Sequence, residues 1–218
     1  MKLKDKITIP NYTLGEELVS AISHGIGSLL SIAALVLCVV FSAIHNNVYA
    51  VVSTTIYGST SIILYTMYNL YNSLKVNNAK RVLRILDHSS IFLLIAGTYT
   101  PYTLVILPPS LGWTIFGIEW ACCIIGITLN SIDLKKFKKI SMILYLIMGW
   151  MIIISFKTLI NNMDIRGIYL MLSGGILYTI GAIFYGIGKK KKYMHSIFHM
   201  FVLSASVLFF FSIFLYVI

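Results

Sequence analysis

Four of the five histidines in the sequence lie close to the first residues of long apolar runs. Two of them, His195 and His199, are four residues apart, which places both imidazoles on one face of a helix about a turn apart. This spacing lets two imidazoles bind one zinc ion, which usually takes at least three protein ligands. Asp87, next to His88, has a carboxylate that is able to bind a metal, to accept a hydrogen bond from a metal-binding histidine, or to act as a base. The pattern therefore predicts a zinc site to which a further donor contributes.

The alternative interpretation of these residues is structural. Imidazoles near the end of a membrane span also hydrogen-bond across helices or lie among lipid headgroups. Asp87 needs a partner in either case, because an unpaired carboxylate just inside a span is costly, and Arg84 lies one turn earlier. Glu119 is isolated in its apolar run. It suits either a hydrogen-bonding core residue or a step on a polar path, and the sequence leaves both interpretations open.

The elements that position these residues follow from composition. The 218 residues are 58% apolar and 11% charged, whereas a soluble domain is about half apolar and a quarter charged, so a soluble globular domain is excluded. The apolar runs are continuous rather than alternating, which favours membrane-spanning helices over barrel strands. We expect an all-α membrane protein, with a polar N-terminal segment at residues 1–21 and one seven-helix transmembrane domain at residues 22–218. The seven spans are expected at residues 22–44, 48–70, 85–107, 111–130, 140–156, 165–187 and 196–218.

The cations give the direction of these helices. Of the 17 Lys and Arg residues, 15 lie in the N-terminal segment and in the second, fourth and sixth connections, and only Lys157 and Arg166 lie on the other side. Cytoplasmic loops collect Lys and Arg, so this split predicts a cytoplasmic N-terminus and a C-terminus outside the cell membrane. Topology accounts for the net charge of +10 without a nucleic-acid partner, and anionic lipid headgroups are additional contacts.

This topology groups the residues of chemical interest. Odd-numbered spans begin at the cytoplasmic face, and the second span ends there, so their polar residues share one membrane depth. The residues that we expect at this depth are His24, Tyr68, Asn72, Asp87, His88, His195 and His199. His45 is expected on the opposite side. A polar site at the cytoplasmic end of the bundle follows.

Two other features concern helix packing. Pro101 stands inside the third span and removes one helical hydrogen bond, which predicts a local bend. Gly167, Gly174, Gly181 and Gly188 recur every seven residues and form a stripe that lets a neighbouring helix approach closely. The three cysteines have neither disulfide nor metal-binding spacing.

The stretch LDHSSIFLLIAGTYTP at residues 86–101 resembles the signature of the hemolysin III family, bacterial relatives of the progestin and adipoQ receptors. The resemblance covers nearly the whole chain, through the motifs GEE at residues 15–17, SHGIG at 23–27, MGW at 148–150, GGILY at 174–178 and HSIFH at 195–199. It implies a seven-helix fold with a cytoplasmic N-terminus and a zinc site near the cytoplasmic face. In the family, a histidine at the end of the second span and two in the seventh hold the metal, and an Asp and a Ser line the site. The wider group includes membrane hydrolases of lipid amides.

This chain departs from that pattern in its second span. Asp87, His195 and His199 match, but Asn72 stands at the position of the zinc-binding histidine and Tyr68 at that of the Ser. An Asn carbonyl is a poor zinc ligand beside imidazole, so the resemblance implies a weakened zinc site unless His24, Asp87 or His88 supplies the missing bond.

Three functions remain open on the sequence alone. The first is a hemolysin III-type membrane protein without efficient hydrolysis, which senses lipids or permeabilises the bilayer (cytolysis). The second is a zinc-dependent hydrolase of a lipid amide or ester, with Asp87 orienting the water or moving its proton and Tyr68 donating a hydroxyl. The third is a proton-coupled transporter that uses Asp87 and Glu119. The expected partners are membrane lipids and a lipid-like ligand or substrate, and the sequence predicts no oligomeric state.

Overall fold

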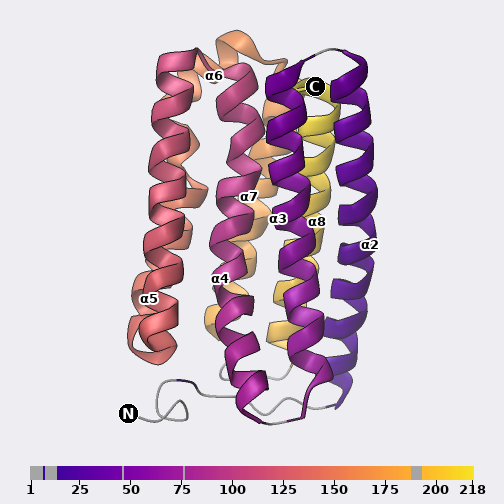
Figure 1. Ribbon diagram of the computed structural model, residues 1–218, viewed down its shortest axis with the longest axis vertical. Coiled ribbons are helices and arrows are strands. Elements are labelled where there is room, and N and C mark those ends of the chain that lie inside the picture. Colours follow the sequence, from indigo (N-terminus) through magenta and orange to yellow (C-terminus); the bar gives the residue numbers. More distant parts are fainter. Residues whose placement is uncertain (1–6, 8–13, 46, 76, 188–192) are drawn as a thin grey trace.

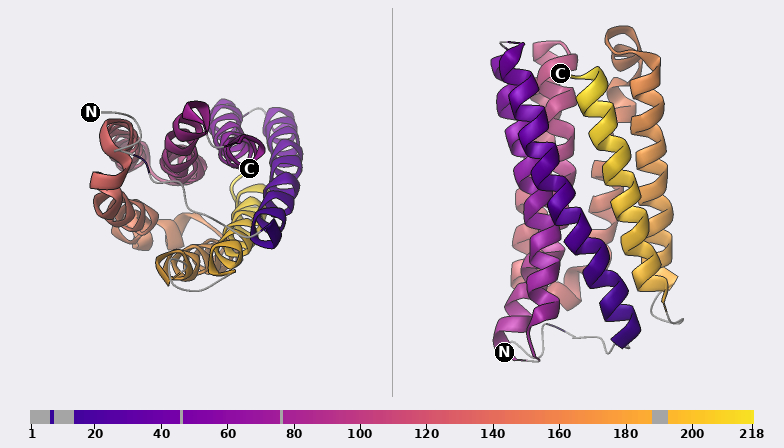
Figure 2. Two further views of the ribbon diagram at one scale, coloured as in Figure 1. Left: turned by 90° about the horizontal axis from the view of Figure 1, so that it is seen from below. Right: turned by 90° about the vertical axis from the view of Figure 1, so that its right-hand side faces the viewer.

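The computed structural model describes residue 7 and residues 14–45, 47–75, 77–187 and 193–218. These residues form long helices that run side by side and make a ring when viewed along the bundle (Figures 1 and 2). The helices are α2 (Leu14–Ile44), α3 (Val48–Ser73), α4 (Asn78–Pro101), α5 (Pro109–Gly149), α6 (Phe156–Asn162), α7 (Ile165–Ile187) and α8 (Met194–Tyr216). A π-helix, η1 (Tyr102–Ile106), follows α4, and a 3₁₀ helix, η2 (Met151–Ser155), precedes α6.

The outer surface of the ring is apolar. Among the described residues, six helical stretches are long and apolar enough to cross a membrane. Large side chains such as Leu29, Ile124 and Ile154 are exposed on it, at 70%, 64% and 74% of their surface. Such a surface is stable in contact with lipid rather than with water. Helices suit this environment because their backbone N–H and C=O groups hydrogen-bond to one another. The prediction of an all-helical multi-pass membrane protein is confirmed.

One of the six stretches, Pro109–Asn162, contains a reversal of the chain. Asp133, inside α5, has φ −161° and ψ 97°, which is not helical. The hydroxyl of Ser141 donates to Oδ1 of Asn130 at 2.7 Å, although the two residues are 11 apart in sequence. A straight helix would separate them by about 16 Å, so α5 folds back at Asp133 into a first half (109–132) and a second half (134–149). Figure 1 shows this turn at the lower end of α5.

Several helix ends differ from the predicted ones. α2 begins at Leu14, within the predicted polar segment 1–21, because Glu16 and Ser20 are buried against α8. α4 begins at Asn78 rather than at residue 85, since Oδ1 of Asn77 accepts the Lys80 N–H at 2.8 Å and caps the helix. The fifth span, expected as one helix over residues 140–156, is interrupted after Gly149 by η2.

The two packing features of the sequence are visible in the structure. At Pro101 the chain passes from α4 into the π-helix η1, which is the local irregularity that the missing N–H predicts. The glycine stripe of α7 faces α8: a Cβ at Gly167 would lie 2.6 Å from the Cβ of Tyr216, and one at Gly174 would lie 2.8 Å from the ring of Phe209. The stripe therefore lets α7 and α8 pack closely. Gly188 lies outside the described residues.

Candidate functional site

The end of the bundle drawn lowest in Figure 1 gathers the starts of α2, α4 and α8, the ends of α3 and α7, and the turn of α5. His24, Asp87, His88 and His199 come to this end because their helices begin there. All four line one internal cavity. His45 lies at the far end of α2, on the exposed surface.

A pair of histidines joins α2 to α8. Nε2 of His24 lies 2.7 Å from Nδ1 of His199, within hydrogen-bond distance, and both side chains are buried. The ring of Tyr68 from α3 stacks on His24 with centroids 3.9 Å apart and lies 4.3 Å from the ring of His199. Two imidazoles and a phenol from three helices therefore form one aromatic cluster.

Polar contacts between α2 and α8 hold this pair in place. The Ser196 hydroxyl donates to the carbonyl of Glu16 at 3.1 Å, and the Ser20 hydroxyl donates to Ser196 at 3.2 Å. Oε1 of Glu16 accepts the backbone N–H of Tyr193 at 2.6 Å, just before α8 begins. Sequence reasoning assigned no role to these residues. Glu16 and Ser196 carry one signal in the sequence, which is their place in the GEE and HSIFH motifs.

An acidic and a basic residue, Asp87 and His88, lie next to each other on α4. Oδ2 of Asp87 is 3.3 Å from Nδ1 of His88, whose Nε2 is 3.4 Å from the Tyr185 hydroxyl on α7. The predicted ion-pair partner of Asp87 was wrong: Arg84 donates to the hydroxyl of Tyr71 at 2.8 Å, and the ion pair is with His88. Asp87 and His88, which are neighbours on one helix turn, thus contact each other beside the cavity.

Three residues singled out in the sequence, Asn72, His195 and Glu119, are not among the described residues that line the cavity. Nδ2 of Asn72 donates to the carbonyl of Tyr68 on its own helix at 3.0 Å, and Asn72 does not line the cavity. His195 lies in the first turn of α8, but its side chain is outside the described residues. Glu119 is fully buried on the first half of α5 and also does not line the cavity. The structure therefore does not bring Glu119 to the histidines.

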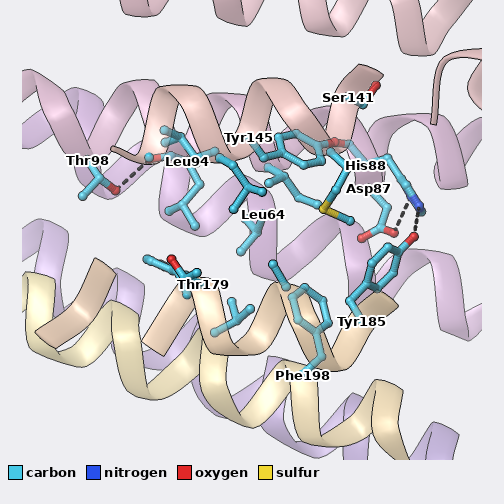
Figure 3. A pocket seen from close by; sticks show the side chains of 18 of the residues that line it. Leu64, Asp87, His88, Leu94, Thr98, Ser141, Tyr145, Thr179, Tyr185 and Phe198 are labelled. Atoms are coloured by element: carbon cyan, nitrogen blue, oxygen red, sulfur yellow. Dashed lines mark hydrogen bonds and ion pairs between the residues drawn. The ribbon is translucent and has the colours of Figure 1, made fainter. Parts of the chain in front are cut away.

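The cavity itself has a volume of about 170 Å³ and runs along the inside of the bundle (Figure 3). On α4 its lining extends from Asp87 to Tyr99, about 18 Å along a helix axis. Polar groups gather at the histidine end. Beyond them the wall is mainly apolar and aromatic, including Leu64, Leu94, Val202, Phe198 and Phe209. The cavity is thus polar at one end and apolar along its length.

The donors that the structure describes at this end are of the kind that zinc prefers. His24 and His199 are imidazoles, which zinc prefers. Among the side chains that the structure describes, no group of three His, Cys, Asp or Glu residues is placed to share one ion. The described donors therefore fall short of the three protein ligands of a typical zinc site.

The fold and the cavity define a class: a multi-pass helical membrane protein with histidines and an acid at one end of an internal, mostly apolar cavity. The model of the family described as Haemolysin-III related matches residues 12–210, and the chain belongs to this family. It is 41% identical over 216 residues to hemolysin-3 of Bacillus cereus, covering 99% of this chain and 98% of that protein. It is 42% identical over 205 residues to the hemolysin-3 homolog of Bacillus subtilis (strain 168), covering 94% and 96%. No solved structure is significantly similar to the chain.

Proposed function

We propose that this protein binds a single-chain lipid-like molecule in its internal cavity and thereby senses or processes membrane lipid. The observation that carries the proposal is the cavity, which extends for about 18 Å from Asp87, polar at the end formed by His24, Asp87 and His199 and mainly apolar beyond it. One leaflet of a bilayer is about 15 Å of hydrocarbon, so the cavity matches one lipid chain in length. A polar group on that chain would meet the histidines and the carboxylate.

The proposal includes seven spans with a cytoplasmic N-terminus. The reversal at Asp133 supports two crossings by α5, and the start of α2 and the end of α8 lie at opposite ends of the bundle (Figure 1). The described cations of the second and fourth connections lie at the histidine end, whereas Lys157 and Arg166 lie at the other. This asymmetry favours a cytoplasmic histidine end.

A binding experiment tests the proposal. Detergent-purified protein is incubated with radiolabelled palmitate, and bound lipid is counted for the native chain and for Ala182→Phe, which fills the cavity wall on α7. The matched control is Ile183→Phe, because the neighbouring Ile183 is 57% exposed on the outer surface. We expect saturable binding to the native and control proteins and at least a tenfold loss in Ala182→Phe. Equal binding to all three proteins would overturn the proposal.

Hydrolysis of a bound lipid amide or ester is a second candidate, favoured by Asp87. Its carboxylate lines the polar end of the cavity beside His88 and suits a base that accepts a proton from water. We extend this proposal to a weak zinc site at His24 and His199, which is supported by their contact and by the orientation of Asn72 away from the cavity. Zinc bound there would supply a Lewis acid. Release of fatty acid from a radiolabelled lipid amide tests it, and the absence of release by zinc-loaded protein would contradict it.

A further inference from the structure

Among the described residues, the ring of helices has a loosely packed seam between the second half of α5 and α7. The neighbours α2 and α3, α3 and α4, α4 and α5, α7 and α8, and α2 and α8 all pack closely. α5 and α7 are not among these closely packed pairs, although residues of both line the cavity. The chain connects them only through η2 and α6, at the end away from the histidines.

The cavity reaches this seam along much of its length. Apart from Leu134 and Ser141, none of the residues that line the cavity from the second half of α5 and from α7 is buried. They include Met142, Leu146 and Gly149 on α5, and Gly175, Thr179 and Ala182 on α7. On either side of the seam the outward residues are exposed isoleucines, among them Ile143, Ile147, Ile176 and Ile183. The seam therefore faces the hydrocarbon of the membrane.

Two glycines mark open space at the seam. A Cβ added at Gly149 or at Gly175 would meet no atom within 4 Å. Gly174, the residue next to Gly175, instead packs against α8, where an added Cβ would lie 2.8 Å from Phe209. On α7, then, the side that faces α8 is tightly packed and the side that faces α5 is open.

At least two side-chain interactions bridge the seam. Nε1 of Trp150, directly after α5, donates to the hydroxyl of Thr179 at 3.0 Å. Nearer the histidines, Nζ of Lys138 lies 5.0 Å from the centre of the Tyr185 ring. Neither is a close backbone contact, and each is a side-chain interaction of modest strength that a rotamer change breaks.

We propose that this seam is a lateral portal through which a single-chain lipid passes from the bilayer into the cavity, at the open space beside Gly149 and Gly175 that adjoins the Trp150–Thr179 bridge. The inference rests on the proposed function, since it concerns the same cavity and names the membrane as the source of its occupant. A membrane lipid is the occupant because the seam opens between apolar helix faces, and the lipid's polar group would follow the side of Lys138 toward the histidines.

The rate of lipid exchange tests this portal. Protein loaded with radiolabelled palmitate is reconstituted into phosphatidylcholine vesicles, and the half-time of palmitate loss to unlabelled acceptor vesicles is measured. Gly175→Leu narrows the seam, and we expect a half-time at least tenfold longer than for the native chain. The matched control is Gly186→Leu, on the same helix, where an added Cβ also meets open space but which does not line the cavity. We expect the native half-time for this control.

A second variant opens the seam without filling the cavity. Thr179→Val keeps the shape of the side chain and removes the acceptor of the Trp150 bridge, so we expect exchange several-fold faster than native. If Gly175→Leu retains palmitate and both variants exchange at the native rate, the portal is wrong and the binding function stands. If the native protein retains no palmitate at all before reconstitution, the proposed function itself is overturned, and the portal with it.

Discussion

At the scale of single residues, the contact between His24 and His199 changes how the polar end of the cavity is understood. The spacing of His195 and His199 predicts a site to which a further donor contributes, and the structure places an imidazole of α2 against His199 and stacks Tyr68 on that imidazole. An additional imidazole from α3 would bring three helices to one ion. Position 72, one turn beyond Tyr68, is where the family pattern places it.

Asn72→His is therefore expected to strengthen zinc binding. The Asn72 amide is turned back to its own helix, so the native α3 offers no strong donor there, and an imidazole adds the third ligand that a zinc site usually has. The measurement is zinc per chain after dialysis against a strong chelator, for native protein, Asn72→His and the control Asn72→Gln. We expect close to one zinc only in Asn72→His. A native chain that already keeps one zinc would show that another residue completes the site.

At the scale of helices, the turn of α5 is held by a few polar atoms. Oδ1 of Asp133 accepts the backbone N–H of Lys136 at 2.9 Å, which caps the second half of the helix. The Asn130 to Ser141 bond ties the two halves together in the buried interior. The second half carries Lys138 and Tyr145 into the cavity wall, so the cap also fixes part of the site.

Asp133→Ala is expected to destabilise the protein by about 1 kcal/mol, the usual cost of losing a helix N-cap. Asp133→Asn keeps a capping oxygen and is the matched control, with an expected change of a few tenths of a kcal/mol at most. Thermal unfolding in detergent measures both. Equal stability of Asp133→Ala and the native chain would mean that the cap does not contribute.

At the scale of the whole molecule, the distribution of charge predicts which ends of the helices face the cytoplasm. Two single-cysteine variants in a background without the native cysteines test this, namely His45→Cys between α2 and α3, and Ser73→Cys at the end of α3; both positions are exposed. A membrane-impermeant thiol reagent added to intact cells should label the first and not the second. The reverse pattern would invert the topology.

The fold was largely predictable because hydropathy and charge are local properties of the sequence. Helix direction also predicts which end of the bundle a residue such as His88 occupies. It does not predict which side chains meet: the partner of His24 depends on how α2 packs against α8, and burial of Glu16 by that packing extends α2 beyond its apolar run. The cavity was not predictable either. It reaches the place where α5 and α7 are not closely packed, and a sequence pattern does not indicate which helices lack contact.

The one-residue break at Asp133 also bears on how the protein is made. A single non-helical residue separates the two halves of α5, so no polar loop lies between them. Without such a loop, one half is poorly able to cross the membrane while the other stays in water. On the proposed seven-span topology, we therefore expect the two halves to insert into the membrane together, as an antiparallel helix pair. Because α5 precedes α7 and α8 in the chain, we expect the cavity wall that this pair forms to be in the membrane before those two helices are synthesised.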